Sequence, residues 1–271
     1  MNALAQLKEF DEASYGDKAA QYSQLHTYYD EKYKIGWFLM DGAPRPCFTP
    51  TLLNELSDYL TTVKAELDET NDQKYDYLVV GSKVDGVFNL GGDLDLFMSL
   101  IKDGNRDELL KYAVHCVDIL YANMFHFDAD ITTVSLIQGD ALGGGFEASL
   151  SSNLIIAERG VKMGLPEVIF NLFPGMGAYS ILSRKVGPAQ AEKMIMSGKL
   201  YTAEELYEMG AIDILAEKGE GELALYKYIK NAKRSPNSFK AMAKVKDICN
   251  PISYEELVSI DVGNRDIVGL L

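Results

Sequence analysis

Short apolar runs alternate along the chain with segments in which apolar residues recur at helical spacing. Buried strands are predicted at residues 35–40, 77–81, 131–137 and 154–157. Between the first two, apolar residues recur every three or four positions from Leu52 to Leu67, and Thr49 can cap this amphipathic helix. A strand–helix–strand order implies parallel pairing with a helical crossover. The pattern therefore predicts an α/β fold.

The pattern changes towards both ends of the chain. Residues 1–30 are polar and rich in tyrosine, so we expect a loosely attached arm or a contact to another subunit. Residues 31–215 carry the alternation of strands and helices, and a capping-box motif at Thr202 predicts one of the later helices. From residue 216 to residue 271 the pattern is helical, which predicts a C-terminal helical region.

Composition narrows the class of protein. The 271 residues are 47% hydrophobic, which is ample for one large domain. The formal net charge of −14 argues against nucleic acid as the main partner. We expect a cytoplasmic protein without a membrane span, because neither a signal-peptide pattern nor a long apolar run occurs. The three cysteines are widely spaced and are expected to be reduced thiols, with no metal site and no cofactor beyond a substrate carrier.

The candidate chemistry lies where two strands end in glycines. The strand at 131–137 leads to Gly143, Gly144 and Gly145, after which a helix can begin, and Asn89-Leu-Gly-Gly-Asp93 follows the strand at 77–81. Glycine lets a ligand approach the backbone, and N–H groups at a helix N-terminus carry the positive end of the dipole. Two such turns can hold a negative oxygen, although a tight turn can also need glycine only for packing.

Two glutamates accompany these turns. Glu147 follows the glycine triplet, and Glu167 lies twenty positions later in the run Met163-Gly-Leu-Pro-Glu167. Two carboxylates beside an oxyanion hole can move the protons needed to form and quench a thioester enolate. In a partly dry pocket their titrations would interact. The alternative is that one of them is a solvated surface charge.

In order and spacing, these motifs resemble those of the crotonase (enoyl-CoA hydratase/isomerase) superfamily. The residues that carry the resemblance are Phe88-Asn-Leu-Gly-Gly-Asp93, Ala141-Leu-Gly-Gly-Gly-Phe-Glu147, Gly164-Leu-Pro-Glu167 and Pro174-Gly-Met-Gly177. The resemblance covers most of the chain and implies a core built as a spiral of ββα turns, assembled into homotrimers or hexamers. Segments 44–48, 89–94 and 170–179 further resemble one branch, the synthases of diffusible signal factors, which are cis-2-unsaturated fatty acids used in quorum sensing.

The resemblance also implies roles for single residues. The N–H groups of Leu90 and Gly144 are expected to form the oxyanion hole. Glu147 is expected to serve the 3-hydroxyl oxygen and Glu167 the α-carbon, although the sequence leaves this order open. Further substrate contacts are expected at Gly91, Gly143, Leu172, Phe173 and Met176. For the last three, ordinary core packing is an equal alternative, and residues 94–100 can likewise form either a wall of an acyl pocket or a core helix.

The implied activity is that of a dehydratase with a second step. A 3-hydroxyacyl thioester of acyl carrier protein would lose water, and hydrolysis of the thioester would then release a free cis-2-unsaturated acid. A general enoyl-CoA hydratase is the alternative, and a non-catalytic crotonase-fold binding protein is a third interpretation that the two glutamates disfavour. Residues 227–246 hold seven basic residues and no acidic one, which predicts either a docking patch for the carrier or a solvated helix face.

Overall fold

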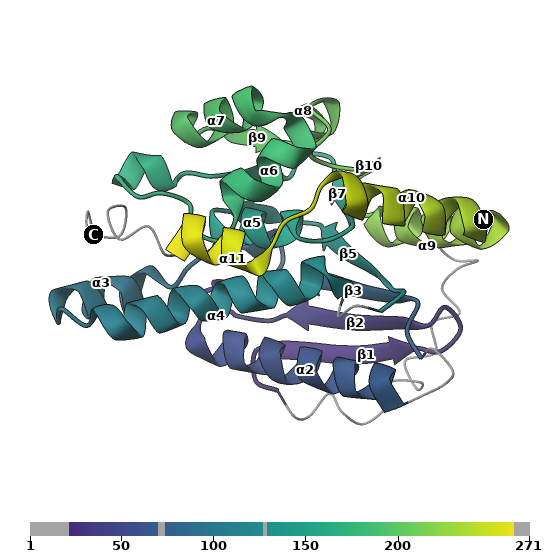
Figure 1. The fold of residues 1–271 in the computed structure, drawn as a ribbon, viewed down its shortest axis with the longest axis horizontal. Coiled ribbons are helices and arrows are strands. Elements are labelled where there is room, and N and C mark those ends of the chain that lie inside the picture. Colours follow the sequence, from purple (N-terminus) through teal and green to yellow (C-terminus); the bar gives the residue numbers. More distant parts are fainter. Residues whose placement is uncertain (1–21, 70–73, 127–128, 263–271) are drawn as a thin grey trace.

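Two β-sheets form the centre of the computed structural model, which describes residues 22–69, 74–126 and 129–262 (Figure 1). The larger sheet has the strand order β1 (Leu25–Asp30), β2 (Ile35–Met40), β3 (Tyr77–Ser82), β5 (Thr132–Ile137), β7 (Leu154–Glu158) and β10 (Ile214–Ala216). The smaller sheet has the order β4 (Val87–Asn89), β6 (Asp140–Leu142), β8 (Lys162–Gly164) and β9 (Leu200–Thr202). β1 and β9 run antiparallel to their neighbours β2 and β8, and the other pairs are parallel.

Successive pairs of strands wind into a spiral. β3 and β4, β5 and β6, and β7 and β8 each place their first strand in the larger sheet and their second in the smaller one. Helices follow each pair: α3 (Leu94–Lys102) and α4 (Arg106–Met124), then α5 (Gly144–Leu150), then the 3-10 helix Glu167–Phe170 and α6 (Ala178–Val186). The predicted α/β fold with a crotonase-like ββα spiral is confirmed.

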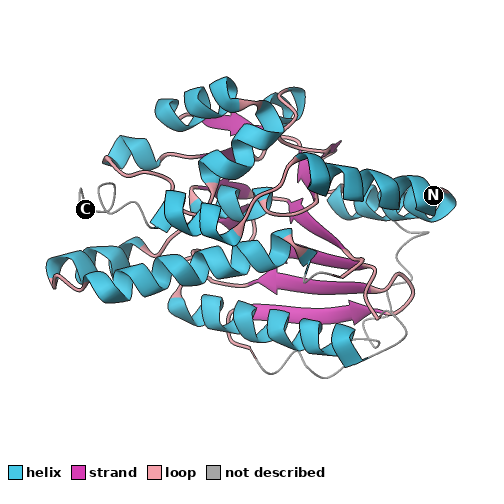
Figure 2. Cartoon of the chain, viewed as in Figure 1, coloured by secondary structure: helices cyan, strands magenta, loops and turns pink. Residues whose placement is uncertain are grey.

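Both faces of the larger sheet are buried, which explains why its strands are almost continuously apolar (Figure 2). Trp37 and Val79 point to one face, where they pack with Leu225 of helix α9 (Gly221–Arg234). Phe38 and Val80 point to the other face, towards α2 (Pro50–Glu69) and α4. The glycine turns of the smaller sheet are therefore carried by a core that is closed on both sides.

Local capping signals place two of the helices as predicted. The Thr49 hydroxyl accepts the Leu52 N–H at 3.1 Å at the start of α2. In the capping box of α8 (Ala203–Glu208), Thr202 Oγ1 accepts the Glu205 N–H at 3.3 Å, and the Glu205 carboxylate accepts the Thr202 N–H at 2.8 Å. Such reciprocal bonds satisfy N–H groups that the helix itself leaves unpaired.

The predicted arm at residues 1–30 is wrong for its last part. β1 pairs with β2 along its whole length, the Tyr28 ring stacks on Trp37 at 5.4 Å between centroids, and the Tyr29 hydroxyl donates to the Lys74 carbonyl at 2.6 Å. A tyrosine buries its ring while its hydroxyl reaches a polar partner, so a tyrosine-rich segment can be an edge strand despite its polar composition. Residues 1–21 lie outside the described part of the chain.

The C-terminal region is helical and returns to the core. The remaining helices are α7 (Pro188–Ser197), α10 (Pro236–Cys249), α11 (Tyr254–Leu257) and a π-helical turn at Val258–Val262. Ile252 and Leu257 belong to the same apolar cluster as Leu25, so this region and β1 share one core with the spiral. Within the described ranges, no helix has both the length and the apolar composition needed to cross a membrane.

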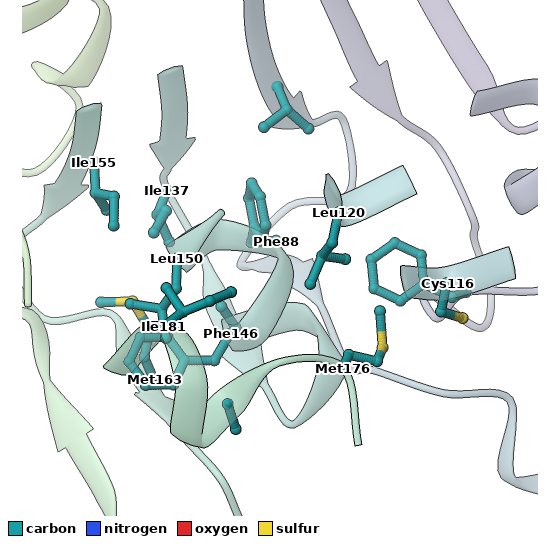
Figure 3. Packing of buried hydrophobic residues seen from close by; sticks show 14 of the residues in the cluster. Phe88, Cys116, Leu120, Ile137, Phe146, Leu150, Ile155, Met163, Met176 and Ile181 are labelled. Atoms are coloured by element: carbon teal, nitrogen blue, oxygen red, sulfur yellow. The ribbon is translucent and has the colours of Figure 1, made fainter. Parts of the chain in front are cut away.

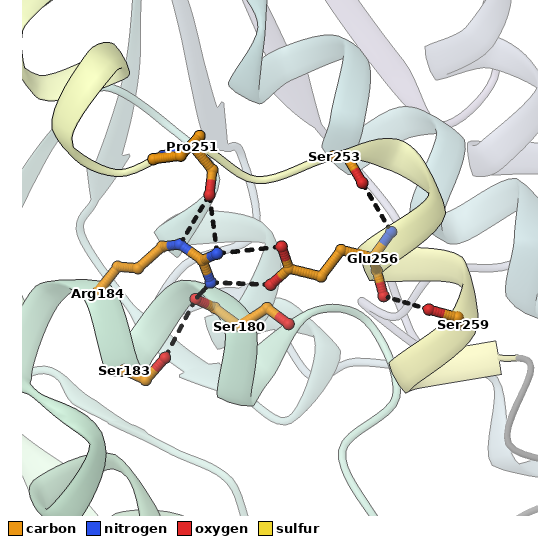
Figure 4. Close-up of polar contacts among 7 residues, drawn as sticks. All are labelled: Ser180, Ser183, Arg184, Pro251, Ser253, Glu256 and Ser259. Atoms are coloured by element: carbon orange, nitrogen blue, oxygen red, sulfur yellow. Dashed lines mark hydrogen bonds and ion pairs between the residues drawn. The ribbon is translucent and has the colours of Figure 1, made fainter.

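An arginine ties the last helices to α6 (Figure 4). Arg184 donates to the Pro251 carbonyl through Nε at 3.1 Å and through Nη2 at 2.8 Å. Its guanidinium also forms a two-point ion pair with the Glu256 carboxylate, each contact at 3.0 Å. The planar guanidinium matches the two oxygens of a carboxylate with two parallel hydrogen bonds. Both side chains are only partly exposed to water.

Replacing Arg184 with Lys keeps the positive charge but removes the planar guanidinium and its several N–H donors. We expect the free energy of unfolding to fall by about 1–3 kcal/mol, because several bonds to a charged group are lost at once. Urea denaturation measures this change. The matched control is Arg159→Lys, whose partner Glu217 lies on an exposed surface, and here the loss should be much smaller, because water screens an exposed ion pair. Equal effects of the two substitutions would contradict the tie between α6 and α11.

Candidate active site

The two predicted glycine turns touch each other through their backbones. The first, at the end of β4, meets the second, which links β6 to α5. A Cβ atom on Gly145 would lie 2.1 Å from the Asn89 carbonyl oxygen, and one on Gly91 would lie 2.9 Å from the Gly144 nitrogen. Gly143 has φ +54°, a conformation that glycine adopts readily. Side chains at these positions would separate the two turns.

Leu90 was expected to supply an oxyanion donor, and the structure contradicts this. The Leu90 N–H donates to the Pro46 carbonyl at 2.8 Å, so it is already used by the chain. The Gly91 N–H is likewise occupied by the Asn89 side chain at 2.7 Å. In the described part of the chain, no acceptor receives the N–H of Gly92 or Gly144. The Gly92 nitrogen lies 3.6 Å from where a Gly144 Cβ would be, so Gly92 and not Leu90 lies beside Gly144.

Glu147 lies in the first turn of α5 and is almost completely buried, with 1% of its surface exposed. Its Oε1 accepts the Met176 N–H at 2.8 Å and the Ala178 N–H at 3.0 Å. These donors lie at and just before the start of α6, where N–H groups lack intrahelical partners. The alternative of a solvated surface charge is therefore wrong for Glu147, whose carboxyl group has a fixed position.

Glu167 opens the 3-10 helix and reaches back to the glycine triplet. Its Oε1 lies 2.5 Å from where a Gly143 Cβ would be, so the missing side chain of Gly143 leaves room for this carboxyl group. Its Oε2 is buried and has no hydrogen-bond partner within the described residues. Burial raises the pKa of Glu167 to about 7, against a smaller lowering by its own backbone N–H. Both protonation states are therefore accessible near neutral pH.

The expected acyl contacts differ in their surroundings. Met176 is buried, and its sulfur lies 2.6 Å from where a Gly144 Cβ would be. Leu172 is half-buried and donates its N–H to the Glu167 carbonyl at 3.0 Å, whereas Phe173 is exposed. In α3 no residue is fully buried, and its large apolar side chains are exposed at Leu94, Met98 and Ile101. Leu96 and Phe97 of the same helix are partly buried and pack against the core, so α3 lies at the edge of the core with its other face exposed.

The basic segment 227–246 lies on α9 and α10, which Figure 1 places at the opposite end of the molecule from α3. Some of its cations have partners within the chain. Lys240 pairs with Asp130, Lys246 lies 3.5 Å from Asp213, and the Lys233 ammonium lies 5.2 Å from the ring centroid of Tyr33. These contacts favour the solvated-face interpretation for part of the segment, and the carrier-docking role stays a prediction.

The comparison with protein families agrees with this geometry. Residues 44–251 match the family described as enoyl-CoA hydratase/isomerase. The chain belongs to the enoyl-CoA hydratase/isomerase family. The match contains both glycine turns and both glutamates, and the predicted crotonase resemblance is confirmed.

Curated relatives of this family share part of their length with the chain. The fatty acid oxidation complex subunit alpha of Idiomarina loihiensis is 31% identical over 200 residues, which are 73% of this chain and 26% of the relative. The subunit of the same name from Pseudomonas savastanoi pv. phaseolicola is 29% identical over 226 residues, covering 82% of this chain and 29% of the relative. The chain thus spans between a quarter and a third of these relatives.

Solved structures share the fold over nearly the whole chain. An enoyl-CoA hydratase from Bacillus anthracis has a TM-score of 0.72 with 17% identity, covering 92% of both chains. DspI from Pseudomonas aeruginosa has a TM-score of 0.71 with 21% identity, covering 94% of this chain and 98% of its own. At these identities the likeness establishes the shared family fold.

The raised pKa of Glu167 gives stability a pH dependence. Relative to the unfolded chain, the folded state favours protonated Glu167, so this contribution is fully present below about pH 4.5 and is lost as pH rises through about 7. Wild type should therefore lose free energy of unfolding relative to Glu167→Gln over this window, by about 1.4 kcal/mol for each unit of pKa shift. Urea denaturation of both proteins at several pH values measures the difference. A difference that does not change with pH would contradict the desolvation of Glu167.

Proposed function

We propose that this protein dehydrates 3-hydroxyacyl thioesters to 2-enoyl thioesters and then hydrolyses the thioester, which releases a free cis-2-unsaturated acid. The observation that carries the proposal is the meeting of Glu147, Glu167 and two glycine turns at one place. Membership of the family supports the thioester substrate. The motifs at 44–48, 89–94 and 170–179, which resemble those of the signal factor synthases, support that branch.

The thioester oxygen is assigned to Gly92 and Gly144. Both have N–H groups that no acceptor receives within the described chain, and they lie beside each other. Backbone donors of this kind stabilise an enolate oxygen without reorganising, and the loss of one typically costs about 10²–10³ in rate. The turn from β6 into α5 also adds the positive end of a helix to the same place.

Dehydration uses the two glutamates in opposite senses. The Glu167 carboxylate takes the proton from the α-carbon, and its pKa of about 7 makes it a base that works near neutral pH. The electron pair of the broken C–H bond forms the enolate and then the double bond between C2 and C3. The C3–O bond breaks as Glu147 gives a proton to the departing hydroxyl, which leaves as water. Until the C3–O bond breaks, the N–H groups of Gly92 and Gly144 stabilise the negative charge on the enolate oxygen.

The second step starts from the protonation states that the first step leaves. Glu147 is then a carboxylate and can take a proton from a water molecule that attacks the thioester carbonyl. Glu167 is then protonated and can give its proton to the departing thiolate as the C–S bond breaks. The same two N–H groups hold the oxygen of the tetrahedral intermediate. Hydrolysis therefore returns both glutamates to their starting states.

A general enoyl-CoA hydratase is the alternative, and the family match favours it equally for the first chemical step. Such an enzyme would interconvert the 3-hydroxyacyl and 2-enoyl thioesters and leave the C–S bond intact. Thioesters of coenzyme A and of acyl carrier protein offer the same phosphopantetheine end to the active site. Free 2-enoic acid as a product therefore separates the two functions, with either carrier.

Glu147→Gln and Glu167→Gln should each lower turnover by about 10²-fold or more, because each variant loses a positioned carboxyl group that transfers a proton in the reaction. The assay supplies a 3-hydroxyacyl thioester on acyl carrier protein or on coenzyme A and measures 2-enoyl thioester and free acid by mass spectrometry. Glu217→Gln, at an exposed carboxylate far along the chain, is the control and should keep full activity. Circular dichroism checks that the variants fold.

Two outcomes of this assay would count against the proposal. Full activity in both single variants would remove the glutamate mechanism altogether. A wild-type protein that forms 2-enoyl thioester without free acid would instead be a hydratase of the general kind.

We also propose a homo-oligomer, a trimer or a hexamer, as the family resemblance implies. The exposed apolar side chains Met242, Val245 and Ile248 on α10 support this, since a helix in contact only with water rarely presents such a row. Light scattering at micromolar concentration should give a mass of at least three chains. A monomer under these conditions would contradict the assembly.

A further inference from the structure

The Tyr112 hydroxyl joins the glycine turn after β4 to the segment that precedes α2. Tyr112 lies in α4 and is buried. Its hydroxyl donates to the Phe48 carbonyl at 2.6 Å and accepts the Asp93 N–H at 3.2 Å. Asp93 directly follows Gly92 in the chain. One side chain from a third element therefore holds the residue next to the oxyanion donor.

The peptide group that carries the Gly92 N–H is held at its other end. The carbonyl of this group belongs to Gly91 and accepts the Phe48 N–H at 2.8 Å. In a planar trans peptide the carbonyl and the N–H point in opposite directions, so this bond directs the Gly92 N–H away from Phe48. Hydrogen bonds in a chain also polarise one another, so a bonded carbonyl makes the N–H of the same peptide group a stronger donor.

Both peptide groups of Gly92 therefore depend on Tyr112. The group before Gly92 is held by the Phe48 N–H, and the Phe48 carbonyl is held in turn by the Tyr112 hydroxyl. The group after Gly92 contains the Asp93 N–H, which the same hydroxyl accepts. A hydroxyl can donate one bond and accept others, and Tyr112 uses both capacities on the same turn.

Tyr112 has a well-defined position of its own. The Phe97 ring meets it edge-on at 5.1 Å between centroids. Burial raises the pKa of Tyr112, so the hydroxyl keeps the proton that it donates. One and two turns later in α4, Cys116 and Leu120 lie in the same apolar cluster as Phe88, which precedes the turn in β4 (Figure 3). The helix and the turn thus share one packed core.

We propose that Tyr112 is a positioning residue for the reaction, whose hydroxyl aims the Gly92 N–H at the thioester oxygen. The proposal rests on the proposed function, which assigns that oxygen to Gly92 and Gly144. Tyr112 acts through the backbone, because its own proton is donated to the Phe48 carbonyl. The enolate oxygen carries more charge than the carbonyl oxygen of the substrate, so a misaligned N–H weakens the transition state more than it weakens substrate binding.

Tyr112→Phe removes the hydroxyl and keeps the ring that packs on Phe97. For dehydration of a 3-hydroxyacyl thioester of coenzyme A, kcat should fall about tenfold or more with KM changed less than about twofold, because a displaced donor costs less than the roughly 10²–10³ of a lost one. Steady-state kinetics measures both constants, and circular dichroism checks that the variant folds.

Infrared spectroscopy adds a readout that needs no turnover. The probe is a ketone analogue of the acyl thioester, with CH₂ in place of the sulfur and without the 3-hydroxyl, so it can be neither dehydrated nor hydrolysed. Its carbonyl band should shift to lower frequency on binding to wild type, because two N–H groups polarise the bond. The shift should be smaller in Tyr112→Phe. A purely structural role of Tyr112 would lower stability and leave the band of the bound analogue unchanged.

Two further variants make the test specific. Tyr226→Phe also removes the hydroxyl of a buried tyrosine, one that donates to Asp30 at 3.2 Å on the opposite face of the larger sheet, and it should keep the kcat and the carbonyl band of wild type. Phe97→Leu keeps the Tyr112 hydroxyl but removes the ring against which Tyr112 packs. It should reduce the band shift in the same direction as Tyr112→Phe and to a smaller extent, and it carries the test if Tyr112→Phe does not fold.

The outcomes separate this proposal from the proposed function. If wild type turns over no thioester but Tyr112→Phe or Phe97→Leu still reduces the band shift, Tyr112 has its positioning role and the proposed reaction is wrong. If wild type releases the free acid and both variants keep its kcat and its carbonyl band, the reaction stands and the positioning role is overturned. Equal losses of kcat in Tyr112→Phe and Tyr226→Phe would overturn it as well.

Discussion

The active site depends on the close approach of two turns, each at the end of a strand in the smaller sheet. β4 and β6 are neighbours in that sheet, and Gly145 packs against the carbonyl of Asn89 at a distance that excludes any side chain. This contact brings the Gly92 and Gly144 N–H groups together. It also fixes where α5 begins, and with it the position of Glu147. A single change of backbone spacing would therefore alter the oxyanion site and one glutamate at once.

The two glutamates reach this place by different means and consequently have different environments. Glu147 is held by backbone N–H groups at the start of α6, which Arg184 in turn ties to α11. Glu167 follows β8, and its carboxyl group occupies the space that the missing side chain of Gly143 leaves. Its Oε2 is buried without a hydrogen-bond partner among the described residues. Burial removes water from the Glu167 carboxyl group, and its own backbone N–H replaces that water only in part, which is why its pKa rises to about 7. Glu147 has a fixed position and Glu167 can change its protonation state near neutral pH, so the two carboxyl groups can divide the proton transfers between them.

Features set by local residues could be predicted from the sequence. The apolar runs of the parallel strands, the caps at Thr49 and Thr202 and the glycine positions follow from contacts within a few residues. Features set by distant partners could not. The Leu90 N–H is lost to the carbonyl of Pro46, so the choice between Leu90 and Gly92 depends on tertiary structure. β1 was missed because its tyrosines gain their burial only from Trp37 and neighbouring strands. The exposure of one face of α3 likewise follows from its position at the outer end of the molecule (Figure 1).

The proposed mechanism requires the thioester oxygen of the substrate to lie between Gly92 and Gly144. A crystal structure of the protein with an unreactive acyl thioester analogue would locate this oxygen. We expect the carbonyl oxygen about 2.7–3.1 Å from both backbone nitrogens, the usual range for an oxyanion hole, with the α-carbon next to Glu167. A carbonyl oxygen bound elsewhere, or one that displaces Pro46 to reach the Leu90 N–H, would contradict it.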